Sequence, residues 1–125
     1  MNGFVDDYGR PLVPLTVSST KSGKSINIHG WIDTGFTGSL LLLPDQVRQL
    51  DLPPMFSLEG SVADGSLTTF ETYLADVTWF GKTELREVLC GGGKFALVGL
   101  LLIEDLVVKI DYPAKTVDLS ISPSA

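Results

Sequence analysis

One carboxylate in this sequence has neighbouring residues that suit a catalytic acid or base. Asp33 opens the triplet Asp33-Thr34-Gly35 and directly follows the apolar pair Trp31-Ile32. A charged side chain at the end of an otherwise buried strand needs a reason, because burial of an unpaired charge is costly. Gly35 lets the backbone turn sharply beside the carboxylate, and the Thr34 hydroxyl can fix the loop by hydrogen bonding. The pattern predicts a carboxylate used as an acid or base, and its structural alternative is an Asx-type turn between two strands.

Two Gly-Lys-Ser/Thr triplets, Gly23-Lys24-Ser25 and Gly81-Lys82-Thr83, are rivals for a functional site. A phosphate-binding P-loop also needs a glycine five residues before the second glycine of its motif. Ser18 and Asp76 occupy those positions, so both triplets are interpreted as hairpin turns. The run Gly91 to Gly93 lacks the spacing of a dinucleotide-binding loop and is interpreted as a connection.

His29 and Cys90 are the only histidine and the only cysteine. His29 lies four residues before Asp33 on the same expected strand, which separates the two side chains by about 13 Å. It is therefore expected to be an ordinary strand residue. Cys90 has no base or cation cluster beside it in the sequence and is expected to be a buried thiol rather than a reactive one. A single cysteine allows no internal disulfide, and this pair of residues makes a structural zinc site improbable, so no metal and no cofactor are expected.

The elements that must position Asp33 are short strands separated by Gly, Pro, Asp and Lys. The expected strands are 12–17, 26–32, 40–43, 57–63, 66–77, 84–89, 95–98, 107–110 and 116–121. Asp64-Gly65 is a strong turn signal for a long hairpin between 57–63 and 66–77. One short helix is expected from Pro44, with Val47 and Leu50 facing inward, and a second over about 101–106. This count predicts a mostly-β, closed or sandwich-like domain with two short helices.

Composition limits the possible partners. The chain has 125 residues, a net charge of −6, 44% hydrophobic and 19% charged residues, and no run of Lys or Arg. One globular domain over 1–125 is expected, with 1–9 compatible with disorder. Nucleic acid and anionic membrane are disfavoured as partners because both require a basic surface. No signal peptide is recognised, and the longest apolar run, 95–103, is too short to span a membrane, so a cytoplasmic location is expected.

The order of these features resembles the retropepsin-like (retroviral-type) aspartic protease family over nearly the whole chain. Asp33, Thr34 and Gly35 match the catalytic loop of that family. The hairpin tip at Ala63, Asp64 and Gly65 matches the flap that closes over a substrate. Leu97, Val98 and Gly99 match the apolar-apolar-Gly motif that packs beneath the loop. The resemblance implies a retropepsin-like acid protease barrel.

The resemblance also implies a mechanism and a partner. Aspartic protease chemistry needs two carboxyl groups sharing one proton, one as a base toward water and one as an acid toward the peptide carbonyl. The sequence holds a single Asp-Thr-Gly triplet. The resemblance therefore implies a homodimer in which Asp33 of each subunit meets at a two-fold axis, acting on a peptide or protein substrate without metal or cofactor.

Two positions depart from the family pattern and keep other functions open. Leu100 follows Gly99 where many members carry an arginine shortly after this glycine, and Phe36 stands where many carry a small residue. Phe36 is expected to crowd the cleft or to line a specificity pocket. The alternative is therefore a catalytically weak or inactive peptide-binding or assembly module on the same fold. A β-barrel that binds a small apolar ligand is a third hypothesis.

Overall fold

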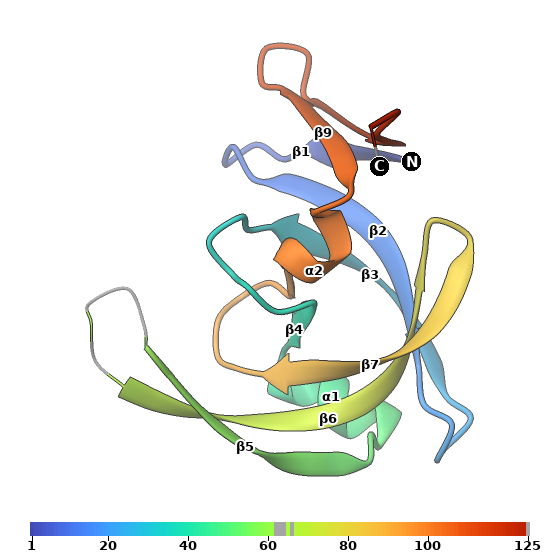
Figure 1. Ribbon diagram of the computed structural model, residues 1–125, viewed down its shortest axis with the longest axis vertical. Coiled ribbons are helices and arrows are strands. Elements are labelled where there is room, and N and C mark those ends of the chain that lie inside the picture. The colour runs from blue at the N-terminus through green and yellow to red at the C-terminus, as the bar shows by residue number, and fades with distance from the viewer. Residues whose placement is uncertain (62–64, 66, 125) are drawn as a thin grey trace.

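The computed structural model of the protein describes residues 1–61, 65 and 67–124, and the side chains of these except at 56–61 and 67–70. Ten strands and two short helices occur in this part of the chain (Figure 1). In chain order they are β1 (Asn2–Val5), β2 (Pro11–Ser18), β3 (Ser25–Ile32), β4 (Leu40–Leu42), α1 (Pro44–Leu50), β5 (Pro54–Ser61), β6 (Leu67–Trp79), β7 (Lys82–Cys90), β8 (Leu97–Val98), α2 (Leu100–Ile103), β9 (Leu106–Asp111) and β10 (Thr116–Ile121). The mostly-β class with two short helices, predicted from the sequence, is confirmed.

The strands form one sheet that closes on itself. Its order is β5-β6-β7-β4-β8-β3-β2-β1-β10-β9, and an additional pairing joins β6 to β2. That pairing runs from Thr16↔Thr78 to Ser18↔Asp76 and makes a closed ring of β6, β7, β4, β8, β3 and β2. Closure removes the free edges of the strands in the ring, and those edges would otherwise be open to pairing with other chains.

The core fills the inside of this ring. Strand β2 shows how the pattern arises, since Val13, Leu15 and Val17 are buried while Pro14 between them is exposed. Successive side chains of a strand point to opposite faces, so alternate apolar residues line the interior. Strand β4 is buried at all three positions, as expected of a strand covered on both faces.

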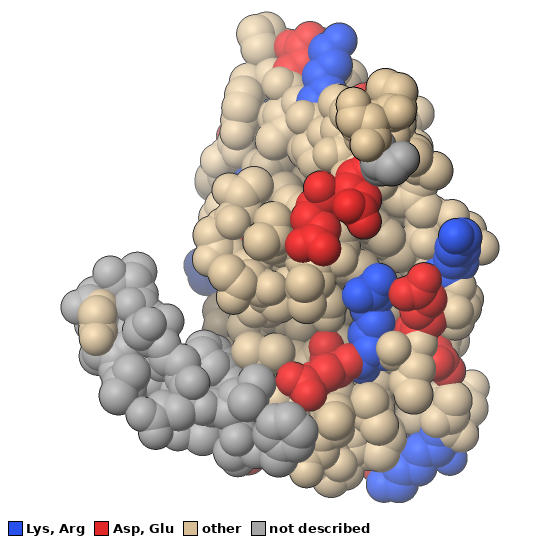
Figure 2. Space-filling model, in the orientation of Figure 1, with Lys and Arg blue, Asp and Glu red and all other residues tan. Residues whose placement is uncertain are grey.

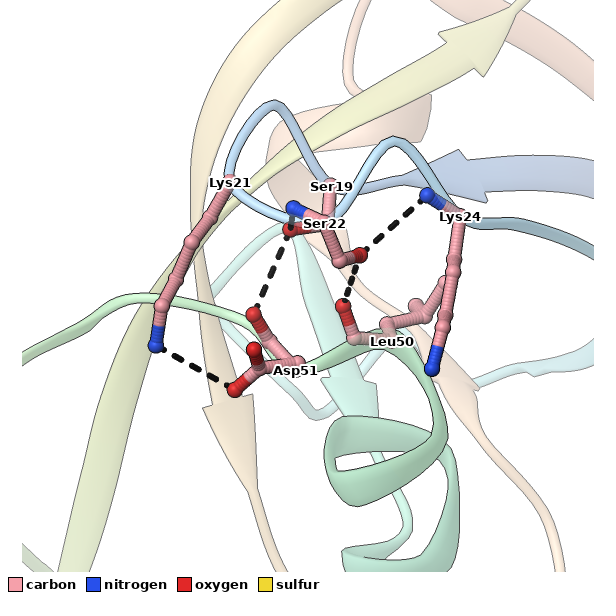
Figure 3. A network of polar contacts seen from close by, with 6 residues as sticks. All are labelled: Ser19, Lys21, Ser22, Lys24, Leu50 and Asp51. Atoms are coloured by element: carbon pink, nitrogen blue, oxygen red, sulfur yellow. Dashed lines mark hydrogen bonds and ion pairs between the residues drawn. The ribbon is translucent and has the colours of Figure 1, made fainter.

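Helix α1 begins at Pro44, which has no N–H to satisfy at that position, and buries Val47 and Leu50 as predicted. The turn between β2 and β3 packs against its C-terminal end (Figure 3). The Ser22 hydroxyl donates to the Leu50 carbonyl at 2.6 Å, and Lys21 pairs with the Asp51 carboxylate at 3.2 Å. The turn therefore satisfies a carbonyl group that the helix leaves without an internal partner.

Four local expectations need correction. Residues 1–9 contain β1, which pairs with both β10 and β2 instead of being disordered. Helix α2 covers only 100–103, because Leu106 already belongs to β9. Strand β8 is limited to Leu97–Val98. The second hairpin turns at Phe80-Gly81, both with positive φ (53° and 73°), so that Lys82 pairs with Trp79.

The long hairpin expected between 57–63 and 66–77 is formed by β5 and β6, whose paired residues run from Ser57↔Glu71 to Ser61↔Leu67. Gly65 is exposed and has a φ of +86°, a conformation that favours glycine. Ala63 and Asp64 lie outside the described residues. In the view of Figure 1 the hairpin projects to the lower left, on the side toward which the loops after β3 and β7 also extend.

Candidate active site

Asp33 stands where β3 leaves the barrel. Strand β3 runs parallel to β8, with Trp31 opposite Leu97 and Ile32 opposite Val98. The Asp33 N–H continues this pairing by donating to the Val98 carbonyl at 2.9 Å. The backbone of Asp33 is thus fixed by the sheet, while its half-buried side chain emerges at the end of the strand.

The Asp33 carboxylate is held by the turn that follows it. The Gly35 N–H donates to Asp33 Oδ1 at 2.9 Å, and the Phe36 N–H donates to the Asp33 carbonyl at 3.2 Å. A Cβ at position 35 would lie 3.3 Å from Asp33 Oδ1, closer than side chains normally approach. The Asx-type turn that was the structural alternative is therefore present, and it orients the carboxylate. Thr34 is exposed on this turn.

Leu97, Val98 and Gly99 lie directly beside this loop. Strand β8 is sandwiched between β3 and β4, with Leu40 opposite Val98 in antiparallel pairing. Past the strand, the Gly99 N–H donates to the Ser39 carbonyl at 2.9 Å and the Leu100 N–H to the Phe36 carbonyl at 2.8 Å. Two segments sixty or more positions apart in the sequence are thus joined by backbone hydrogen bonds around Asp33.

Phe36 is not among the residues that line the hollow beside Asp33 described below. Its ring lies against two glycines: a Cβ at Gly38 would come 2.7 Å from Phe36 Cζ, and one at Gly99 would come 2.6 Å from Phe36 Cδ2. A real Cβ does not approach this closely, so the ring occupies space that only glycine leaves open at these two positions. Phe36 thereby packs the Asp33 loop onto the start of α2, and the expectation that it crowds the cleft or lines a specificity pocket finds no support in this packing.

A hollow of about 220 Å³ opens beside the carboxylate, lined by Trp31, Ile32, Asp33 and Leu97. Its lining is apolar except for Asp33. Such a hollow suits an apolar side chain of a bound ligand, with the carboxylate as the polar group that meets it.

Arg10 stabilises the aromatic side of this hollow, and nothing in the sequence marked it. Its guanidinium carbon lies 4.2 Å from the centre of the Phe95 ring, 4.9 Å from that of Tyr8 and 5.8 Å from that of Trp31. Trp31 and Phe95 also meet edge to face, with ring centres 6.3 Å apart. The cation–π contacts of Arg10 with Trp31 and Phe95, and the aromatic contact between these two rings, join segments distant in sequence. Only the fold brings them together.

Asp6 in turn holds Arg10. The Arg10 Nε donates to Asp6 Oδ2 at 2.7 Å, and the backbone N–H groups of Arg10 and Tyr8 donate to Asp6 Oδ1 at 2.9 and 3.0 Å. Partial burial acts to raise the pKa of Asp6, but these hydrogen bonds and the Arg10 charge outweigh it and lower the pKa below its ordinary value of 3.8.

His29 and Cys90 lie in surroundings that favour a structural rather than a chemical role. The His29 ring meets Phe4 edge to face with ring centres 5.3 Å apart. Cys90 is half-buried and lies opposite Glu71 on the neighbouring strand. Burial raises the pKa of the Cys90 thiol, and the Glu71 charge raises it further, so the thiolate form is suppressed.

Among the side chains that the structure describes, no three of His, Cys, Asp or Glu gather as a metal site would require. Over residues 1–61, 65 and 67–124 there is no helix with the length and apolar character needed to cross a membrane.

Comparison with solved structures identifies the architecture. The crystal structure of a retropepsin-like aspartic protease from Rickettsia conorii matches 95% of this chain and 88% of its own, with a TM-score of 0.64 and 16% sequence identity. The EIAV protease, in complex with the inhibitor HBY-793, matches 77% of this chain and 86% of its own, with a TM-score of 0.54 and 15% identity. No protein-family model matches the sequence, and the comparison with curated proteins gives no match. With its closed ring and with Asp33-Thr34-Gly35 and Leu97-Val98-Gly99 side by side, this chain has the retropepsin-like fold.

Proposed function

We propose that the protein is an aspartic endopeptidase that acts as a homodimer, with Asp33 of each subunit as its catalytic carboxyl group. One observation carries the proposal: the Asp33 carboxylate is held at the end of β3 by the Gly35 N–H, beside an apolar hollow lined by Trp31 and Leu97. The fold it shares with a retropepsin-like aspartic protease supports the proposal.

The chemistry follows from two carboxyl groups that share one proton. The ionised carboxylate takes a proton from water, and the water oxygen forms a bond to the carbonyl carbon of the peptide. The protonated partner gives its proton to the carbonyl oxygen, which produces a tetrahedral diol. When the C–N bond breaks, the carboxyl group that took the proton from water gives it to the leaving nitrogen, and one hydroxyl group of the diol returns a proton to the other carboxylate. The products are a carboxylic acid and an amine, and the pair again holds one proton. Two carboxyl groups close enough to share a proton cannot both remain ionised, so activity is expected at mildly acidic pH.

The remaining residues of the site have supporting roles in this proposal. Gly35 fixes the orientation of the carboxylate through its N–H, and Thr34, exposed on the turn, braces the loop against the second subunit. The β5–β6 hairpin, with Gly65 near its tip, would cover an extended peptide and bind it by strand addition. Leu97, Val98 and Gly99 support the loop from beneath.

The experiment compares wild type with Asp33→Asn on denatured proteins and a peptide library between about pH 4 and 7, the range in which such dyads work. Products are identified by mass spectrometry, with and without pepstatin. Cleavage by the wild type that is lost in D33N and blocked by pepstatin is expected. The matched control is Asp118→Asn, because Asp118 is an exposed aspartate on β10, and this variant should retain full activity.

Two other outcomes contradict the proposal. Identical products from wild type and D33N would mean that Asp33 does not carry the cleavage. Absence of cleavage by a protein shown to be dimeric, with peptides that bind unchanged, would favour the alternative of a peptide-binding module on this fold.

A further inference from the structure

A second hollow, the β6–α2 groove, has a volume of about 200 Å³ and shares no lining residue with the hollow beside Asp33. Its floor is apolar and is formed by Val77 and Trp79 of β6 and by Leu101 and Leu102 of α2. Trp79 Nε1 donates a hydrogen bond to the Leu102 carbonyl at 2.9 Å, which joins the strand to the helix. Because this N–H is the only hydrogen-bonding group of the indole, the Trp79 ring offers a ligand apolar surface alone.

Two large apolar side chains at this groove are open to solvent. Leu101 is 50% exposed, and Ile121 at the end of β10 is 71% exposed. Covering such surface removes apolar area from water and is favourable. Pockets that hold drug-sized molecules have volumes of roughly 300–1,000 Å³, so a hollow of about 200 Å³ is better suited to one large side chain. A partner protein binds such a hollow through a single buried anchor residue.

Charged side chains of both signs surround the groove. Lys82, Glu84 and Arg86 alternate along β7 and therefore project from one face of the sheet. This is the face of the groove, because Lys82 and Glu84 lie opposite Trp79 and Val77 of the floor. In Figure 2 Lys and Arg side chains lie over β7, and acidic side chains gather over the end of α2 on the same face.

Two of these charges are available to a ligand. Arg86 and Glu84 pair with each other at 3.0 Å. Lys82 on β7 and Asp105 just after α2 are both exposed, and neither has an ion-pair partner in the described part of the chain. A ligand that presents an acidic group to Lys82 and a basic group to Asp105 is complementary to both walls, whereas a ligand with charges of one sign is repelled by one of them.

The surroundings of Asp33 differ in this respect. Asp33 is the only charged residue between His29 and Asp45, and no charged residue occurs from Phe95 to Ile103. Selection of a partner by charge is therefore a property of the β6–α2 groove and not of the Asp33 loop.

We propose that the β6–α2 groove is a docking site for an extended segment of a partner protein in which one large apolar residue lies between a basic and an acidic residue. The apolar side chain enters the hollow over Trp79, the acidic residue pairs with Lys82, and the basic residue pairs with Asp105. Docking here does not use Asp33, so the inference is independent of the proposed function and goes beyond it.

The experiment uses a phage-displayed library of random peptides as the probe. Peptides are selected on the D33N protein, which leaves them intact under the proposed mechanism, and counter-selected on D33N that also carries Leu101→Arg. The arginine introduces a charge and a longer side chain at the apolar floor. The retained peptides are expected to place a large apolar residue between a basic and an acidic residue.

The tightest retained peptide is then synthesised with a fluorescein label, and its dissociation constant is measured by fluorescence polarisation. Leu101→Arg should weaken binding by about 10-fold or more, because a buried anchor carries much of the binding energy. The matched control is Leu85→Arg. Leu85 is also an exposed leucine (59%) and lies between Glu84 and Arg86 on β7, so its side chain projects from the opposite face of the sheet. This control should bind the peptide as the parent protein does.

Lys82→Glu tests the charged wall and does not alter the floor. In the D33N background it should weaken binding of the original peptide and restore binding of a second peptide whose acidic residue is replaced by lysine. An unfolded variant would bind neither peptide, and circular dichroism checks each fold. The inference is wrong if no peptide survives the counter-selection, if K82E binds the original peptide as tightly as its parent, or if L85R weakens binding as much as L101R.

Discussion

At the scale of the residue, the Asp33 loop depends on how one aromatic ring packs against two glycines. Phe36 lies over Gly38 and Gly99, where small residues are required, but the reason differs between the two. At Gly38 the nearest atoms to a new Cβ all belong to the Phe36 ring. At Gly99 a new Cβ would also run into the carbonyl oxygens of Gly38 and Phe36.

This difference gives a prediction for a double-mutant cycle. Gly38→Ala should destabilise the wild type by about 1–3 kcal/mol, the usual cost of forcing an extra carbon against a packed side chain. In a Phe36→Ala background the obstacle is gone, and Gly38 does not require a positive φ. There the same change should be neutral or stabilise by about 0.4–1 kcal/mol, because alanine restricts the unfolded chain. Urea denaturation gives both values.

Gly99→Ala is the control for this cycle. Because its obstacle is backbone, it should remain destabilising whether or not Phe36 is present. An equal cost of G38A in both backgrounds would show that Phe36 does not determine the requirement for glycine at position 38.

At the scale of the element, the turn between β1 and β2 connects the N-terminus to the site. Asp6 accepts hydrogen bonds from the side chain and backbone of Arg10, and Arg10 in turn packs on Phe95 and Trp31 beside Asp33. Through Arg10 the turn therefore supports the aromatic side of the hollow. The ionised Asp6 carboxylate strengthens this support because it holds the Arg10 side chain in place.

The interaction between Asp6 and Arg10 should weaken at low pH. The folded-state pKa of Asp6 is lowered from 3.8. The ionised carboxylate therefore adds stability that is fully present above the unfolded value and is lost as the pH falls through the lower folded value. Asp6→Asn should reduce the thermal midpoint relative to wild type at about pH 7, and the difference should shrink toward about pH 2.

Thermal unfolding followed by circular dichroism across this range measures the effect. An Arg10→Ala background is the control, because without the guanidinium the D6N difference at neutral pH should become smaller while the backbone hydrogen bonds to Asp6 remain. A difference between wild type and D6N that is constant with pH would show that the Asp6 charge contributes nothing.

At the scale of the whole molecule, the proposed site is complete only in a pair of chains. Subunit mixing tests this directly: wild type is combined with D33N, allowed to exchange, and assayed for cleavage. In an equal mixture about a quarter of the dimers contain two wild-type chains, so activity per total protein should fall to about a quarter. A fall to one half would mean that each chain works alone. Leu85→Arg, which should dimerise normally, is the control added in place of D33N, and it should leave the activity undiminished.

Much of the fold was open to prediction because it follows from local patterns. The alternation in β2, the buried run of β4, the start of α1 at Pro44 and the turn at 112–115 all result from interactions close in sequence. Predictions failed where the structure of a segment depends on a pairing strand that is distant in the sequence. Strand β1 forms because β10 and β2 lie on either side of it, and its own residues give little signal. Helix α2 ends early because the chain must enter β9 to pair with β10.

Residue type and near neighbours are enough to predict the Asp33-Thr34-Gly35 turn, the mostly-β class and the lack of charge on both segments around Asp33. The same local signals do not predict that β8 lies between β3 and β4, that Phe36 packs on Gly99, or that Arg10 reaches Phe95 and Trp31. The physical reason is the same in each case. These contacts join segments tens of residues apart, and barrel closure determines which of the many sterically possible pairs actually meet.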